Sequence, residues 1–113
     1  MHEMSLAEGM LQIVEDTAKG NAASRVTAIW LEIGTLAQVE RDALRFCFDA
    51  VTRGGIAEGA RLEIIDTPGA AWCVRCAGRV ALAALGDACP QCGSYQLQVV
   101  AGNDMRIKEI AIE

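Results

Sequence analysis

The chain has 113 residues and a mass of 12.0 kDa, the size of one small domain near the lower limit of what a single hydrophobic core stabilises. Hydrophobic residues make up 52% of it, which excludes a disordered protein, and no apolar run reaches the roughly 18 residues of a membrane span. The net charge of -5 argues against nucleic-acid binding. The first residues lack the basic and apolar regions of a secretion signal, so we expect a cytoplasmic, reducing location.

The N-terminal region predicts an amphipathic helix. Ser5 and Glu8 have the spacing of a capping box, which places the helix start at Ser5 and leaves residues 1–3 outside the helix. Gly20 and Asn21 are typical of a helix end. The predicted buried stripe has helical spacing and consists of Leu6, Met10, Ile13, Val14 and Thr17.

Three strands and a second helix are predicted further along the chain. Residues 25–33 are rich in β-branched and large apolar types, and their expected core set is Val26, Ile29, Leu31 and Ile33. Residues 40–53 again repeat at helical spacing, with an apolar face of Leu44, Cys47, Phe48 and Val51. Residues 61–67 and 105–112 alternate apolar and polar positions and predict strands.

This order of elements predicts an α+β fold, in which two helices pack on one face of a small mixed β-sheet. A cysteine-rich segment interrupts the pattern before the last strand. We therefore expect a discontinuous main domain, residues 1–68 and 102–113, and an inserted zinc-ribbon-like knuckle at residues 69–101.

Four of the five cysteines form two C-x-x-C motifs, separated by 12 residues: Cys73 with Cys76, and Cys89 with Cys92. Four thiolates make a closed tetrahedral shell, which suits structural zinc and leaves no open position for catalysis. Disulfides, a redox-active cysteine pair and a rubredoxin-like iron site remain alternatives. Cys47 lies on the apolar face of the second predicted helix, and we expect it to fill the core.

The N-terminus carries the only histidine of the chain, His2. The Met1 amine, the His2 amide nitrogen and His2 Nδ1 can close a five- and a six-membered chelate ring on one metal ion, with Glu3 or a nearby carboxylate in the fourth position. Such a nitrogen-rich, near-planar set suits Ni(II) or Cu(II) and suits zinc poorly. The alternative is a lone terminal histidine without fixed structure.

Segments along the whole chain carry a family resemblance: MHEMSL, IGTLAQVE, FCFDAV, AEGARLEI, the first C-x-x-C, CPQCGS and GNDMRIKEIAIE. In these segments the sequence resembles the HypA/HybF family of accessory proteins for NiFe-hydrogenase maturation. The resemblance implies a similar fold and a nickel site at Met1, His2 and Glu3, with Glu40 at a further acidic position near it. It also implies zinc at the two cysteine motifs, that is, at Cys73, Cys76, Cys89 and Cys92.

The resemblance further implies a nickel metallochaperone that serves the hydrogenase large-subunit precursor together with the nickel-binding GTPase HypB, as a monomer or a homodimer. The sequence contains no nucleophile and base constellation and no phosphate-binding glycine loop, so we expect no enzyme activity. We expect neither nucleic acid nor membrane as a partner. The main alternative is a zinc-ribbon protein-interaction module without a nickel role, and a thiol redox enzyme is a third possibility.

Overall fold

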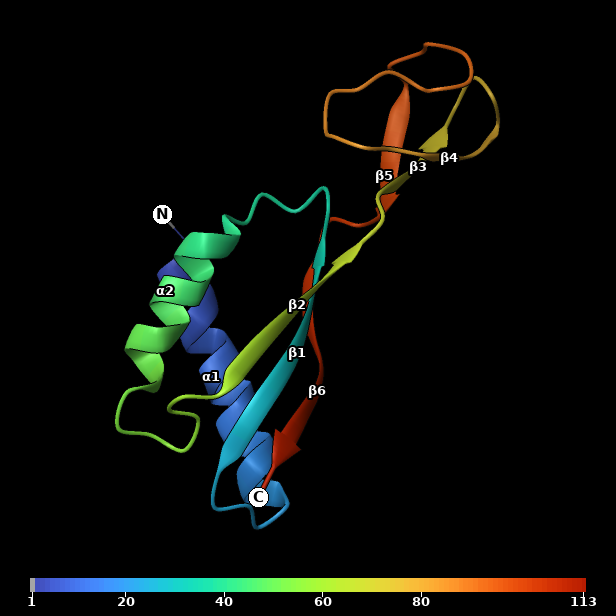
Figure 1. Ribbon diagram of the computed structural model, residues 1–113. Helices are drawn as coiled ribbons and strands as arrows, with labels where there is room; N and C mark the ends of the chain where they lie inside the picture. The colour runs from blue at the N-terminus through green and yellow to red at the C-terminus, as the bar shows by residue number, and fades with distance from the viewer. Residues whose placement is uncertain (1) are drawn as a thin grey trace. The chain divides into compact units, whose positions relative to one another are not determined.

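A computed structural model describes residues 2–113 and confirms the α+β class. Figure 1 shows the elements, which among the described residues follow in the order α1 (Glu3–Gly20), β1 (Val26–Gly34), α2 (Arg41–Thr52), β2 (Arg61–Thr67), β3 (Ala70–Cys73), β4 (Gly78–Ala81), β5 (Leu97–Ala101) and β6 (Met105–Ile112). Neither of the two helices is both long and apolar enough to cross a membrane.

The strands form two three-stranded sheets, with the orders β2-β1-β6 and β4-β3-β5. The first sheet is mixed, as predicted. Strands β1 and β6 run antiparallel, because Gly34 N donates to Asp104 O at one end and Glu113 N donates to Arg25 O at the other. Thr35, the residue after β1, donates its N–H to the carbonyl of Thr67, the last residue of β2. The two strands therefore end side by side and run parallel.

The chain divides into two compact units. The first comprises the residues up to Leu31, Val39–Ile64 and Ile107–Glu113, and the second comprises Glu32–Gln38 and Ile65–Arg106. Strands β1, β2 and β6 each pass from one unit into the other along their length. The first unit holds both helices, and the second holds the complete sheet β4-β3-β5.

In the first unit both helices lie on one side of the strands (Figure 1). The core set predicted for β1 is confirmed, since all four side chains are fully buried. Helix α2 buries Leu44, Cys47 and Phe48 as predicted, whereas Val51 is only half-buried and Thr52 takes the fourth core position. The Thr52 hydroxyl donates to Phe48 O at 2.8 Å, which satisfies this buried polar group.

Helix α1 differs from its prediction in both start and buried face. It begins at Glu3, with His2 as the N-cap and a hydrogen bond from Leu6 N to His2 O of 3.0 Å, so the capping box at Ser5 is wrong. Ile13 and Thr17, both expected in the core, are exposed, and Ile13 has 57% exposure. The buried face of α1 contains alanines where larger residues were expected, because small side chains let two helices pack closely. The buried residues are Glu3, Ala7, Met10, Val14 and Ala18.

The second unit contains a sheet that the sequence did not predict. Strand β3 pairs antiparallel with both β4 and β5, and one side of this sheet packs into a core around the cysteines. Leu36, from the connection between β1 and α2, is 3% exposed and belongs to this core. The other buried members are Ala71, Cys73, Val80, Leu82 and Cys89.

Three glycines allow chain segments of the second unit to cross in contact. A Cβ at Gly34 would collide with the carbonyl of Gly102, and a Cβ at Gly102 would lie 2.5 Å from Gly69 Cα. A Cβ at Gly69 would lie 2.6 Å from Leu36 Cγ. Gly102 also has φ +84, a conformation that only glycine adopts without strain. We call Gly34, Gly69 and Gly102 the glycine junction.

The buried face of α2 predicts unequal roles for its two phenylalanines. Phe48→Ala should lower the free energy of unfolding by about 3–5 kcal/mol, because it opens a cavity in the core. Phe48 is 1% exposed, whereas Phe46 on the same helix is 70% exposed, so Phe46→Ala serves as the matched control and should change stability little. Urea denaturation of zinc-loaded protein measures both. Equal losses for the two variants would show that the helix packs by another face.

Candidate metal centres

The first cysteine motif lies in the turn between β3 and β4. Cys73 is the last residue of β3, and Cys76 lies in the turn that leads to β4 at Gly78. The amide of Cys76 donates to Cys73 Sγ at 3.3 Å. Ala77 takes a left-handed conformation with φ 52, which closes the turn. This turn therefore directs the sulfur atoms of Cys73 and Cys76 toward one site.

The second motif repeats this arrangement before β5. Cys89 N donates to Ser94 O at 2.8 Å, and Gly93 N donates to Cys89 O at 2.9 Å. Gly93 has φ 77, so glycine suits this turn. Two turns therefore face each other, and each contributes two sulfur atoms.

The four sulfur atoms lie within 4.8 Å of one another, and no other such group of His, Cys, Asp or Glu occurs among residues 2–113. Cys73 Sγ is 3.7 Å from Cys92 Sγ, and Cys76 Sγ is 3.8 Å from Cys89 Sγ. These are free cysteines and not disulfides, in which the sulfurs are bonded at about 2.05 Å. Four sulfurs bound tetrahedrally to zinc at about 2.3 Å lie about 3.8 Å apart, so this donor set fits the ion.

The thiols of this cluster differ in acidity. The backbone amide of Cys92 donates to the Cys89 sulfur and lowers the pKa of Cys89 to about 7. A hydrogen bond with the Cys92 thiol raises the pKa of Cys76 to about 12. Without a cation some thiols of the cluster therefore keep their protons. A divalent ion would neutralise the thiolates and so favour loss of these protons.

Cys47 plays no part in this cluster. It is 2% exposed on the buried face of α2, where a thiol packs as a small hydrophobic group. Its predicted place in the core is confirmed.

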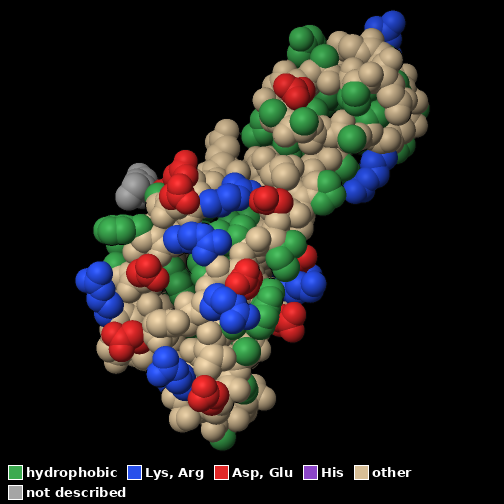
Figure 2. Space-filling model, viewed as in Figure 1, with side chains coloured by type: hydrophobic (Ala, Val, Ile, Leu, Met, Phe, Trp, Pro, Cys, Tyr) green, Lys and Arg blue, Asp and Glu red, His purple; other side chains and the backbone are tan. Residues whose placement is uncertain are grey.

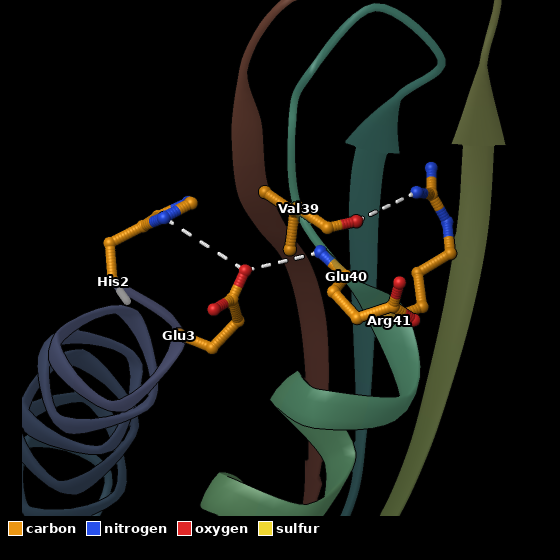
Figure 3. A network of polar contacts seen from close by, with 5 residues as sticks. All are labelled: His2, Glu3, Val39, Glu40 and Arg41. Atoms are coloured by element: carbon orange, nitrogen blue, oxygen red, sulfur yellow. Dashed lines mark hydrogen bonds and ion pairs between the residues drawn. The ribbon is translucent and has the colours of Figure 1, made fainter.

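The N-terminal candidates lie where α1 begins beside the start of α2 (Figure 3). His2 Nδ1 is 3.9 Å from Glu3 Oε2, and the same oxygen accepts a hydrogen bond of 3.2 Å from the amide of Glu40. The fourth candidate, Met1, lies outside the described residues. Glu3 thus joins the first turn of α1 to the N-cap of α2.

Glu3 is buried to an unusual degree for a carboxylate, with 5% exposure. The hydrogen bond from the Glu40 amide is the main reason that the pKa of Glu3 lies below its ordinary value, and the nearby His2 adds to this effect. The Glu40 side chain has another role, because it accepts from Asp42 N at 3.4 Å and caps α2. The structure therefore joins Glu3 to the backbone of Glu40 and not to its carboxylate.

The family model for hydrogenase/urease nickel incorporation, metallochaperone, hypA, matches residues 1–112. The chain belongs to the HypA family. Full-length relatives support this assignment, because chain and relative cover each other completely. The hydrogenase maturation factor HypA of Dechloromonas aromatica is 60% identical, and that of Azotobacter chroococcum is 58% identical. The resemblance inferred from the sequence is thereby confirmed.

Solved HypA structures share the fold. The Ni metallochaperone HypA from Helicobacter pylori superposes with a TM-score of 0.73 at 24% identity, covering 99% of this chain and 97% of that one. A second HypA solution structure gives a TM-score of 0.74 at 23% identity, covering 100% of this chain and 97% of that one. The HypA fold, two helices on a small sheet with a cysteine knuckle before the last strand, is therefore also the fold of this chain.

The Glu3 contact predicts a pH-dependent contribution to stability. Glu3→Ala should lower the thermal midpoint at about pH 7, because the amide of Glu40 loses its acceptor in this part-buried hydrogen bond. Since the pKa of Glu3 is depressed by folding, this contribution is present above the unfolded pKa of 4.5 and disappears as the pH falls through the folded value. The difference in thermal midpoint between wild type and variant should therefore disappear at acid pH.

The control for this measurement is Glu8→Ala, which removes an exposed carboxylate from the same helix. Circular dichroism melts of the three proteins at about pH 7 and below about pH 4 provide the comparison. A constant gap across this range would show that the Glu3 charge contributes nothing to the contact.

Proposed function

We propose that this protein is a nickel metallochaperone that binds Ni(II) through Met1, His2 and Glu3 and delivers it for NiFe-hydrogenase maturation. The observation that carries the proposal is the place of His2, the sole histidine, at the very start of α1 with Nδ1 3.9 Å from the Glu3 carboxylate. The His2 side chain is 57% exposed, so an incoming ion can reach it.

The helix start favours an ion that binds amide nitrogen. The first amides of an α-helix have no acceptor within the helix, so a metal can replace the proton of one without breaking a helical hydrogen bond. Loss of that proton also adds negative charge at the positive end of the helix dipole, which stabilises it. Ni(II) and Cu(II) accept such nitrogen-rich, near-planar ligand sets, and zinc suits them poorly. Glu40 remains a candidate for an outer acidic position.

We assign one structural zinc ion to the four clustered cysteines. The sulfur spacing supports this choice, and the closed shell leaves no position for a substrate. Nickel would then be handled by residues 1–68 and 102–113, and zinc by residues 69–101. A closed four-thiolate site should exchange its ion slowly, whereas a terminal site can share its ion with a partner during transfer.

The partners that fit this role are the hydrogenase large-subunit precursor and the GTPase HypB, in the cytoplasm. The family description names hydrogenase and urease nickel incorporation, which supports a delivery role without catalysis by this chain. We therefore propose that the protein is not an enzyme and that any nucleotide hydrolysis comes from the partner.

The zinc assignment predicts that Cys73→Ala or Cys92→Ala will lose stoichiometric zinc while much of the helical signal remains, because only the second unit depends on the ion. Cys47→Ala is the matched control, since this cysteine does not belong to the four-sulfur cluster, and it should keep the metal. Elemental analysis and far-UV circular dichroism measure the two effects. Retention of one zinc in either cluster variant would refute the four-cysteine site.

The nickel assignment predicts that His2→Ala abolishes the specific nickel site and leaves zinc content unchanged. An N-terminal extension should do the same, because it converts the Met1 amine into an amide and breaks the first chelate ring. A C-terminal extension is the control and should bind nickel normally. Affinity should also fall as the pH drops through about 6.5, where imidazole gains a proton.

Isothermal titration of zinc-loaded protein with Ni(II) compares these forms between about pH 6 and 8. Equal nickel affinity in the untagged, N-terminally extended and His2→Ala forms would exclude the terminal site. The chain would then fit the zinc-ribbon interaction module better than the chaperone.

A further inference from the structure

The sheet β4-β3-β5 has one buried and one exposed side. Cys73 and Ala71 face the cysteine core, whereas Trp72 between them is 44% exposed. The register places Trp72 opposite Arg79 on β4 and Gln98 on β5, so the three side chains share the exposed side. Val100 of β5 is 49% exposed. We define the Trp72 face as Trp72, Arg79, Gln98 and Val100.

Two of the four residues of this face, Trp72 and Val100, are large exposed hydrophobic groups. Exposed sheet positions normally carry polar side chains, and contiguous exposed hydrophobic groups mark interaction sites. Figure 2 shows several separate hydrophobic side chains, and few charged ones, on the part of the surface that includes β3, β4 and β5. Trp and Arg, the two largest side chains of the face, are the types that most often dominate binding energy at protein interfaces.

A recess of about 360 Å³ adjoins Arg79. Its other walls are small or apolar: Pro68, Gly69, Ala70, Val80 and Ala81. Gly69, one of the lining residues, belongs to the glycine junction, where a Cβ has no space. A second hollow of about 390 Å³ shares Pro68 and Arg79 with the first and includes Val100. Arg79 therefore borders both hollows, and an apolar side chain fits the smaller one.

The charge of Arg79 is unpaired. Arg106, which lines the larger hollow, is neutralised by Glu32 at 2.6 Å. Arg79 makes no ion pair or hydrogen bond with any residue in the described range 2–113. Arg79 therefore presents an unpaired guanidinium at the edge of the smaller recess, while Glu32 and Asp104 lie with Arg106 around the larger hollow.

We propose that the Trp72 face docks an extended acidic segment of a partner polypeptide. A carboxylate side chain of that segment pairs with Arg79, whose planar guanidinium binds carboxylates in a bidentate manner. A neighbouring apolar side chain occupies the recess beside it, and Trp72 covers the segment. The proposal concerns neither metal site and stands independently of nickel binding.

The test uses a fluorescein-labelled, capped peptide with the sequence Gly-Leu-Glu-Gly-Leu-Glu and zinc-loaded full-length protein. Fluorescence anisotropy should detect binding that weakens with added salt, because a charge pair contributes. A matched Gly-Leu-Gln-Gly-Leu-Gln peptide, which keeps the shape and removes the charge, should bind about tenfold more weakly, a typical loss for a central interface contact. A Gly-Gly-Glu-Gly-Gly-Glu peptide keeps the charge and removes the leucine side chains, and it should also bind about tenfold more weakly.

Arg79→Ala and Trp72→Ala should each weaken binding of the acidic peptide about tenfold. Arg79 is exposed, so its replacement leaves the fold intact, and zinc content verifies this for both variants. Arg53→Ala, which removes an exposed arginine at the end of α2, should leave binding unchanged. Failure of the peptide to bind, or equal binding by the Arg79→Ala protein, would overturn the proposal. A monomer–dimer equilibrium abolished by Arg79→Glu would also overturn it, by assigning the face to a second copy.

Discussion

Four cysteine sulfurs lie within 4.8 Å of one another, so the second unit has to balance four thiol groups at one point. The free thiols accommodate this proximity by keeping protons, as the raised pKa of Cys76 indicates. The zinc ion that we propose here would replace those protons and hold the two turns together. The small core around the cysteines depends on the same constraint, because Cys73 and Cys89 are both among its buried members.

The start of α1 depends on a second constraint, the burial of Glu3. A carboxylate that is 5% exposed requires a donor, and the amide of Glu40 supplies it. This contact fixes the first helical turn against the start of α2 and sets the position of His2, the residue before Glu3. Two residues of the proposed nickel site, His2 and Glu3, thus lie at the N-cap and in the first turn of α1, whereas the sequence predicted them outside the helix.

Local patterns predicted most of the fold. The strands at 61–67 and 105–112 have their predicted bounds, because alternation and flanking turn residues define them locally. The prediction failed where long-range packing decides. The capping-box pattern at Ser5 was overruled by the contact of Glu3 with Glu40, 37 residues away. The inner face of α1 was wrong because the larger Ile13 was preferred to Ala7 and Ala18, which are small enough for close packing.

The cysteine ligands could be identified from the sequence, whereas the core that surrounds them could not be fully predicted. C-x-x-C spacing identifies thiol ligands without any knowledge of the fold, and the structure brings all four together. The alternation of Val80 and Leu82 beside the first motif could have indicated the sheet around the cysteines. Nothing in the local sequence could have placed Leu36 in that core, since it arrives from a connection more than 30 residues away.

The glycine junction brings the two ends of the cysteine segment together. Gly69 and Gly102 begin and end the cysteine segment, yet they touch, so the segment leaves and re-enters the chain at one point. An insertion with adjoining ends costs the host little loop entropy whether it is present or absent. A short turn could therefore replace the segment between these glycines in this chain. A protein that received the segment would also have to supply a counterpart of Leu36, which packs into the core of the segment from outside it.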